Sequence, residues 1–309
     1  MRERVQEPVA LAAAERAFRA LAEGALVLPA PVHLRIPEAD GEVHIKSAHL
    51  AGSATFTVKI ASGFYGNPAR GLPSGSGMLL VFDAVTGYPL ALLRDNGYLT
   101  DLRTGAAGAL AARLLAPARP GRVAVVGSGA QAGFQLRALA GVREWDEAVI
   151  WSRNPEHAAR RSRELAQELG RPTSPAATVR EAVAGAGLVV TVTPSREPLV
   201  HAGWLSPGAT VIAVGSDGPG KRELALDVLQ RADKVITDLT AQSRRLGELQ
   251  HAPPDLPVHG ELGEVLTGRV AGREGGELIV CDLTGVGAQD AAIAEAALSA
   301  VAPPAPGPF

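Results

Sequence analysis

A glycine-rich segment between an apolar run and a predicted helix constrains this chain more than any other feature. Residues 122–133 read Arg-Val-Ala-Val-Val-Gly-Ser-Gly-Ala-Gln-Ala-Gly, a Gly-x-Gly-x-x-Ala pattern that directly follows a strand-like run. Gly127 permits the tight turn, Gly129 lets backbone approach a pyrophosphate, and Ala132 keeps helix and strand close. The N–H groups that open the helix suit phosphate oxygens. A dinucleotide site is therefore expected, with an ordinary tight turn as the alternative, at Gly127, Ser128, Gly129, Ala130, Gln131 and Ala132.

Up to residue 118 the sequence predicts a smaller, mixed α+β domain. Helical spacing of apolar residues at 9–22 and 99–115 flanks several short strand-like runs. Two of these runs, 78–82 and 88–92, are separated by a turn with glycine near its end, which is typical of an antiparallel hairpin. We expect residues 1–118 to form a substrate-binding and dimerisation domain.

After a proline- and glycine-rich break at 117–121, strands and helices alternate. Such alternation needs right-handed crossovers and predicts a Rossmann-like, doubly wound parallel sheet of the α/β class. We expect residues 119–287 to form an NAD(P)-binding domain, and the segment 288–309 to complete the first domain with a helix before a frayed tail at 303–309. The predicted strands are 123–126, 148–151, 188–193, 210–214, 235–238 and 278–282, and the predicted helices are 131–139, 157–169 and 222–231.

Composition and charge exclude several classes of function. Lys and Arg number 30 and Asp and Glu 32, and because the charges are scattered we expect no nucleic-acid or membrane partner but a small soluble ligand. The start lacks the apolar run of a signal peptide and no stretch is long enough to span a membrane, which predicts a cytoplasmic protein. Neither metal-ligand spacing of histidines nor a Gly-x-Ser-x-Gly elbow occurs, so no metal is expected. The single cysteine, Cys281, is interpreted as a buried strand thiol.

The end of the second predicted strand of the nucleotide domain bears on the choice of cofactor. An NAD site normally has Asp or Glu there to accept the ribose hydroxyls. This chain instead reads Trp151-Ser152-Arg153-Asn154. A guanidinium with a neighbouring hydroxyl and amide suits a 2′-phosphate, which predicts that NADP(H) is preferred and NAD(H) is possible. The alternative is that Arg153 is solvated and that Ser152 or Asn154 caps the next helix.

Further motifs are spread over most of the chain. A lysine strand with an Asn-Pro turn occupies 58–68 and an Arg-Thr helix begins at 99. A Val-Gly-Ser-Asp-Gly-Pro-Gly-Lys-Arg-Glu-Leu segment occupies 214–224, and a Thr-Gly-Val-Gly-Ala-Gln-Asp turn occupies 284–290. Together with the glycine loop, these segments resemble the ornithine cyclodeaminase/μ-crystallin family. The resemblance implies a homodimeric NAD(P)-dependent oxidoreductase for an α-amino or imino acid, whether an imine or ketimine reductase, an amino-acid dehydrogenase or a cyclodeaminase.

The resemblance also implies roles for three side chains. Arg103 would hold a substrate carboxylate through its planar guanidinium. Lys59 points away from the strand face of Val58 and Ile60, towards either solvent or a cleft, and the resemblance makes it a catalytic or substrate-binding group. Asp217 follows a strand at the carboxyl edge of the parallel sheet, where ligands bind. The resemblance implies that Asp217 faces the substrate nitrogen, with capping of a following helix as the alternative.

Other positions follow the family pattern less directly. Arg35 stands at the place of a further carboxylate-binding arginine. Cyclodeaminating members carry a Glu followed by Met-Pro shortly before the catalytic lysine, and this chain has Lys46 there. Lys46 is therefore expected to bind substrate and to repel the distal ammonium of ornithine, unless it points to solvent. Contacts to the cofactor are also expected from Thr104, Thr193, Val214 and Gly285.

Two other classes of protein share parts of this pattern. A non-catalytic, μ-crystallin-like protein that binds NADP or a small ligand would keep the same fold, but the intact set of Lys59, Arg103 and Asp217 favours an enzyme. A methyltransferase also uses a glycine-rich loop, but it should carry an acidic group for the ribose where this chain has Ser152 and Arg153.

Overall fold

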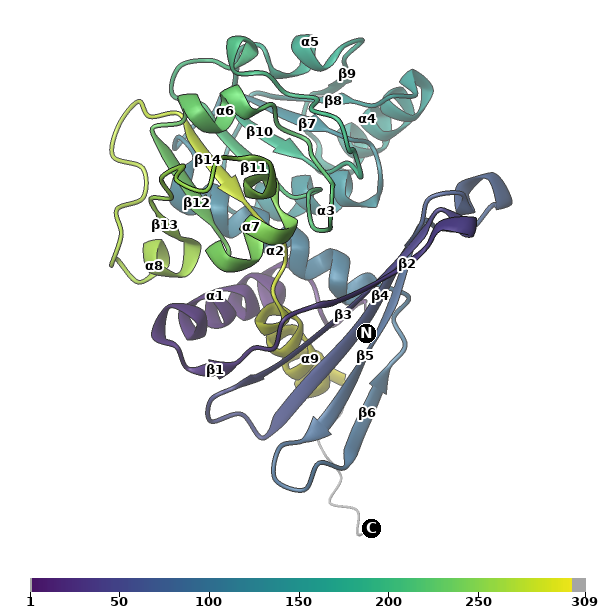
Figure 1. Ribbon diagram of the computed structural model, residues 1–309. Coiled ribbons are helices and arrows are strands. Elements are labelled where there is room, and N and C mark those ends of the chain that lie inside the picture. The colour runs from purple at the N-terminus through teal and green to yellow at the C-terminus, as the bar shows by residue number, and fades with distance from the viewer. Residues whose placement is uncertain (1, 302–309) are drawn as a thin grey trace. The chain divides into compact units, whose positions relative to one another are not determined.

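The computed structural model describes residues 2–301, which form two compact units (Figure 1). Unit 1 comprises the residues up to Arg103 together with those from Val286 onward, and unit 2 comprises Thr104–Gly285. The division falls inside the helix α2 (Tyr98–Leu115), before the break at 117–121 where we placed the boundary. The functional limits 1–118 and 119–287 stay a prediction. The expected frayed tail lies outside the described residues.

Unit 1 is built on an antiparallel sheet in the strand order β1-β3-β4-β5-β6, with β2 also paired to β3. The hairpin expected from the sequence is confirmed, because Leu80 of β5 pairs with Leu92 of β6. The strands are β1 (Leu26–Val27), β2 (Val32–Ile36), β3 (Gly41–Leu50), β4 (Thr55–Phe64), β5 (Gly75–Asp83) and β6 (Pro89–Leu93), with short 3-10 turns η1 (Pro37–Ala39) and η2 (Asn67–Arg70).

Two helices cover one face of this sheet. The first, α1 (Glu7–Glu23), buries Ala10, Ala14, Ala17 and Phe18 at the spacing of one helical stripe. It packs on α9 (Gly287–Val301), which lies against β3 and β4. Both predicted helices are thus confirmed. None of the helices in residues 2–301 is long and apolar enough to cross a membrane.

The other face of the sheet stays open and is apolar. Cross-strand pairing aligns Ile60 with Met78 and Val58 with Leu80, while the rings of Phe56 and Phe82 stack. Side chains on this face are half-buried or exposed. Lys59 points the opposite way, as expected, but the helices cover that side, so Lys59 is buried and does not face solvent.

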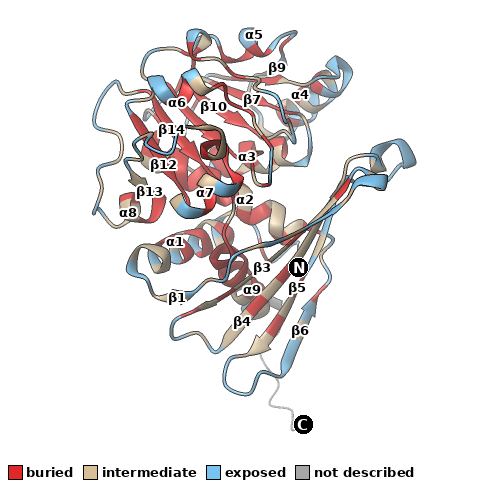
Figure 2. Ribbon diagram, in the orientation of Figure 1, coloured by how far each residue is buried: buried red, intermediate tan, exposed pale blue. Residues whose placement is uncertain are grey.

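Unit 2 contains eight parallel strands in the order β13-β12-β14-β11-β10-β7-β8-β9. From β7 the chain adds β8 and β9 on one side and then crosses to β10 on the other, so the order reverses between β7 and β10, where α/β folds bind ligands. Figure 2 shows the central strands buried. The strands are β7 (Arg122–Val126), β8 (Glu147–Trp151), β9 (Thr173–Pro175), β10 (Ala186–Thr191), β11 (Thr210–Ala213), β12 (Lys234–Thr237), β13 (Gly260–Glu261) and β14 (Ile279–Asp282).

The helices of unit 2 match the predictions in part. The two after β7 and β8 are confirmed, whereas the predicted helix 222–231 is a helix only from Leu226, because Leu224 bridges to Val200 in extended conformation. Cys281 is fully buried in β14, as expected. The helices are α3 (Ala130–Ala140), α4 (Pro155–Leu169), α5 (Val179–Val183), α6 (Leu226–Arg231), α7 (Thr240–Leu246) and α8 (Leu262–Leu266), with 3-10 turns η3 (Ala202–Trp204) and η4 (Glu248–His251).

Candidate functional site

The glycine loop after β7 has the geometry that its sequence predicts. Gly127 adopts φ +122°, and a Cβ there would lie 2.9 Å from the Val192 carbonyl oxygen, so only glycine fits. Gly129 precedes α3, and nothing lies within 4 Å of where its Cβ would be. No side chain caps this helix. The start of α3 thus has no side-chain cap, which suits the pyrophosphate of a dinucleotide.

In the segment after β8, one predicted cofactor contact caps a helix and the other two do not. Asn154 caps α4, because its side chain accepts a hydrogen bond from the Glu156 N–H at 2.9 Å. Arg153 is exposed and Ser152 is half-buried. Arg161 of α4 was missed from the sequence, and its Nε donates to the Ser128 carbonyl of the glycine loop at 3.3 Å. No local pattern marks this contact, because it joins residues 33 positions apart in the sequence.

The loops after β10 and β11 are tied together by Glu223. Its carboxylate accepts from the N–H and Oγ of Thr193 at 2.6 and 2.7 Å, from the Oγ of Thr191 at 2.6 Å and from the Gly215 N–H at 2.8 Å. Burial raises the pKa of Glu223 to about 7, although the bonds from the threonines oppose this. The sequence analysis listed Thr193 and Val214 as cofactor contacts but gave no role to Glu223, although Glu223 lies within the family motif at 214–224.

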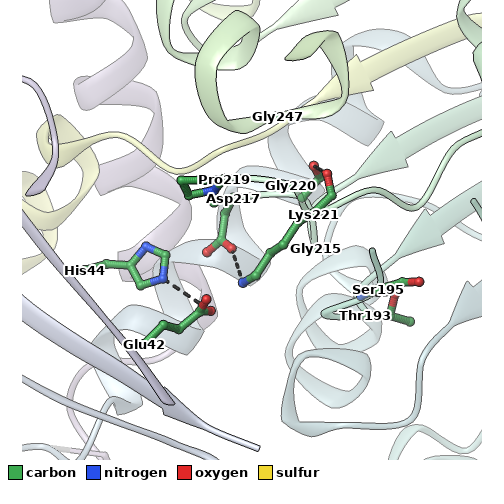
Figure 3. A network of polar contacts seen from close by, with 12 residues as sticks. Glu42, His44, Thr193, Ser195, Gly215, Asp217, Pro219, Gly220, Lys221 and Gly247 are labelled. Atoms are coloured by element: carbon green, nitrogen blue, oxygen red, sulfur yellow. Dashed lines mark hydrogen bonds and ion pairs between the residues drawn. The ribbon is translucent and has the colours of Figure 1, made fainter. Parts of the chain in front are cut away.

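Asp217 lies on the loop after β11 and pairs with a buried lysine. The Lys221 ammonium donates to Asp217 Oδ1 at 2.7 Å (Figure 3), and the Asp217 side chain is 37% exposed whereas that of Lys221 is 5% exposed. Gln250 of η4 holds the loop by bonding Gly218, Gly220 and Lys221 through backbone atoms. The capping alternative fails, because the next helix begins at Leu226.

Two further positions of unit 2 were expected to contact a cofactor. Gly285 donates its N–H at 2.6 Å to Asp238, a buried carboxylate at the end of β12 that also accepts from the Thr284 hydroxyl. Thr104 lies on α2, where its carbonyl accepts from the Gln135 side chain at 3.1 Å. Neither Asp238 nor the neighbouring buried Asp282 was singled out from the sequence.

In unit 1, Lys59 and Arg103 share one buried carboxylate. Lys59 Nζ lies 2.9 Å from Asp290 Oδ2, and Arg103 Nε donates to Asp290 Oδ1 at 3.0 Å. The three side chains are 1% to 7% exposed. Gly287 lets α9 bring Asp290 this close to the sheet, because a Cβ there would lie 2.5 Å from the Ser47 carbonyl oxygen of β3.

The electrostatics of this group depend on burial. Burial, together with the charges of Arg103 and Lys46 and against the effect of Asp290, lowers the pKa of Lys59 from 10.5 to about 7. Burial alone would raise the pKa of Asp290, but Lys59, Arg103 and Lys46 hold it below its usual value of 3.8. Positive charge therefore prevails here, and the group is suited to an anionic ligand.

Of the two remaining predicted residues of unit 1, Lys46 is buried next to Lys59 and Arg35 is exposed. Lys46 of β3 pairs in register with Lys59 and is 4% exposed, so it does not point to solvent. Arg35 is exposed on β2 and pairs in register with Glu42, so the structure does not bring it to Lys46 and Lys59. Glu42 also accepts from Tyr65 at 2.6 Å and lies 3.3 Å from His44 Nε2 (Figure 3).

Comparison with known proteins identifies the family of this chain. The family model described as the ornithine cyclodeaminase/mu-crystallin family matches residues 2–300. The chain belongs to the ornithine cyclodeaminase/μ-crystallin family. A Rhizobium meliloti protein provisionally named a dehydrogenase is 44% identical over 299 residues, covering 94% of this chain and 90% of that protein.

Two solved structures resemble the whole chain. The Δ1-pyrroline-2-carboxylate reductase of Thermococcus litoralis, in complex with NADH and L-proline, is 28% identical with a TM-score of 0.89, over 95% of this chain and 93% of that one. An archaeal alanine dehydrogenase dimer with bound NAD is 32% identical with a TM-score of 0.86, over 95% of this chain and 91% of that one.

Lys59 should make the stability of the chain rise with pH above neutrality. Because its folded pKa is about 7 instead of 10.5, the unfolded chain keeps a proton in this window that the folded chain has released. Stability then increases by up to about 1.4 kcal/mol per pH unit from pH 7 upward, while below pH 7 Lys59 is charged in both states and adds no slope. Denaturant titrations at several pH values would measure this rise, and Lys59→Met should abolish it.

Asp290→Asn serves as the matched control. Removing the carboxylate that raises the pKa of Lys59 should move the start of the rise to lower pH. Identical pH slopes in the wild type and in Lys59→Met would contradict the prediction.

Proposed function

We propose that this protein is an NAD(P)-dependent oxidoreductase that interconverts an α-imino acid and an α-amino acid. The observation that carries the proposal is the buried group of Lys59, Asp290 and Arg103. Burying two cations around one carboxylate is costly and is expected where an anion must be bound. The family and the open glycine loop add a nicotinamide dinucleotide, which is also the kind of ligand named for the two solved structures.

In this proposal each side chain has a distinct task. The dinucleotide supplies or accepts the hydride. Arg103 binds the substrate carboxylate, and Lys59 supports it and holds or releases a proton at its ammonium. The Asp217 carboxylate stabilises the positive charge of the iminium and moves a proton to or from the nitrogen. The bond from Lys221 fixes the direction in which Asp217 points.

Asp217→Asn should lower turnover at least about 100-fold while folding and cofactor binding persist, since a neutral amide replaces a carboxylate where positive charge develops. Turnover would be measured with NADPH or NADH on pyruvate with ammonia, pyrroline-2-carboxylate and piperideine-2-carboxylate. Asp255→Asn, an exposed carboxylate of the same unit, is the control. A collapse of the melting temperature with full activity of the folded fraction would overturn this role for Asp217.

We further propose a preference for NADP(H) over NAD(H). The exposed Arg153 stands at the end of β8, where a carboxylate would otherwise accept the ribose hydroxyls. Asn154 is used as a helix cap, so Arg153 and Ser152 are the groups left for a 2′-phosphate.

Arg153→Ala should weaken NADP(H) binding about 10- to 150-fold and leave NAD(H) nearly unchanged, because one guanidinium–phosphate contact is lost. Fluorescence titration of both reduced cofactors measures it. Arg160→Ala removes an exposed arginine of the following helix, α4, and should change neither affinity. Equal NADPH affinity in wild type and Arg153→Ala would rule out the preference.

Ornithine should be a poor substrate. Lys46 is buried beside Lys59, and a second ammonium at about 4 Å would be repelled by roughly 1 kcal/mol in water and about 4 kcal/mol in a partly buried site. An uncharged or acidic side chain would be accepted instead. Steady-state assays for proline and ammonia test this, and Lys46→Met should raise the rate with ornithine relative to that with cyclic imines. Efficient conversion of ornithine by the wild type would refute the proposal.

We also propose a homodimer that covers the open face of the sheet in unit 1. Met78, Leu90 and Leu92 are 37% to 50% exposed, and exposed apolar faces of this kind mark protein contacts. A second copy is the occupant, as in the archaeal structure that is named a dimer.

Leu92→Glu should convert the dimer to a monomer in light scattering after size-exclusion chromatography, because the charge would be buried without a partner. Val85→Glu is the control, since Val85 is 91% exposed at the turn between β5 and β6. A wild-type protein that stays monomeric at micromolar concentration would contradict this assembly.

A further inference from the structure

One fully buried carboxylate in unit 2 joins two loops that leave neighbouring parallel strands. Glu223 is 0% exposed, and its oxygens accept four bonds of 2.6 to 2.8 Å from Thr191, Thr193 and Gly215. Thr191 ends β10 and Thr193 follows it, while Gly215 follows β11. Two of the four donors are backbone N–H groups, which can only donate, so both loops depend on an acceptor at this point.

The two loops approach each other as closely as backbone permits. A Cβ on Gly215 would lie 2.1 Å from the Thr193 carbonyl oxygen and 2.6 Å from Glu223 Oε2. Any other residue at 215 would push the loops apart. The absence of a side chain at Gly215 allows this approach, and the two oxygens of Glu223 bond both loops. The carboxylate therefore sets the distance between the loops.

Each loop carries a residue of the proposed site. Thr193 is an expected cofactor contact and donates to Glu223 through both its N–H and its hydroxyl. Gly215 lies two positions before Asp217. Movement of either loop would therefore shift a cofactor contact or the proposed acid/base group.

The groups around Glu223 are uncharged donors and other buried acids. All four of its donors are uncharged. From η4, the buried Glu248 accepts the N–H groups of Glu223 and Leu224, and burial, Asp282 and Glu223 raise the pKa of Glu248. Behind it, the buried Asp282 of β14 acts on Glu248. On the same segment as Glu223, Arg222 donates to the Leu224 carbonyl.

We propose that Glu223 is a positioning residue of the cofactor and substrate site, whose ionised carboxylate holds the Thr193 loop and the Asp217 loop at their working distance. The inference rests on the proposed function for the roles of those two loops. When Glu223 gains a proton, the protonated oxygen becomes a donor and a weaker acceptor, so the bond that it accepts from the Thr193 or the Gly215 N–H weakens. Cofactor affinity and turnover then fall together as pH drops through neutrality, in line with the pKa of Glu223 near 7 that burial produces.

The test compares Glu223→Gln with Asp282→Asn. Asp282 is an equally buried acid at the same edge of the sheet, and burial raises its pKa to about 7 as well, but it accepts from Ser243 and Leu249. Glu223→Gln should weaken NADPH or NADH binding about 10- to 150-fold, lower turnover by a similar factor and flatten the pH profile of kcat near neutrality. Asp282→Asn should leave cofactor affinity and that profile within about twofold of wild type.

Two results would overturn the proposal. One is unchanged cofactor affinity and an unchanged pH profile in Glu223→Gln, and the other is an equal loss in Asp282→Asn. If Glu223→Gln does not fold, Thr191→Val removes a single donor from a strand residue and should shift the same readouts in the same direction by a smaller factor. Cofactor titration needs no turnover, so a wild type that binds NADPH but reduces no imino acid disproves the proposed function and still allows the loop test.

Discussion

The ion pairs that Asp290 makes with Lys59 and Arg103 are the interaction on which unit 1 depends. Lys59 belongs to the middle of the sheet, Arg103 to the first turns of α2, and Asp290 to the C-terminal helix. Removing one partner from a buried ion pair costs about 3–5 kcal/mol, because it leaves a charge without compensation. Because the chain returns to unit 1 at Val286, Asp290 can supply the carboxylate that compensates the charges of Lys59 and Arg103.

Much of the fold could be predicted from local patterns. The glycine loop, the helices that follow β7 and β8, and the hairpin of β5 and β6 each depend on spacing within a short segment, and such spacing is visible in the sequence. The full length of β3 was not visible, because Gly41–Leu50 mixes buried polar residues such as His44 and Lys46 with apolar ones. A strand whose buried face is partly charged does not show the usual alternation.

The partners of the site residues could not be predicted in the same way. Lys59 and Asp290 are more than two hundred positions apart, and Glu223 contacts Thr191 across a strand crossover. A single carboxylate in a loop has many possible partners, and only the register of the sheet selects among them. The capping alternative held for Asn154 and failed for Asp217, a difference set by where α4 and α6 begin.

The two units bury charge in opposite ways, and the pKa values of their buried acids differ accordingly. Unit 1 encloses Lys46, Lys59 and Arg103 around Asp290, so it lowers the free energy of a bound carboxylate. Unit 2 buries Glu223, Asp238, Glu248 and Asp282 at the strand ends of its sheet, where backbone N–H groups serve as donors to them. Because neutral donors do not offset the cost of burial, the pKa of Glu223 and that of Asp282 rise to about 7, whereas the cations of unit 1 keep Asp290 ionised.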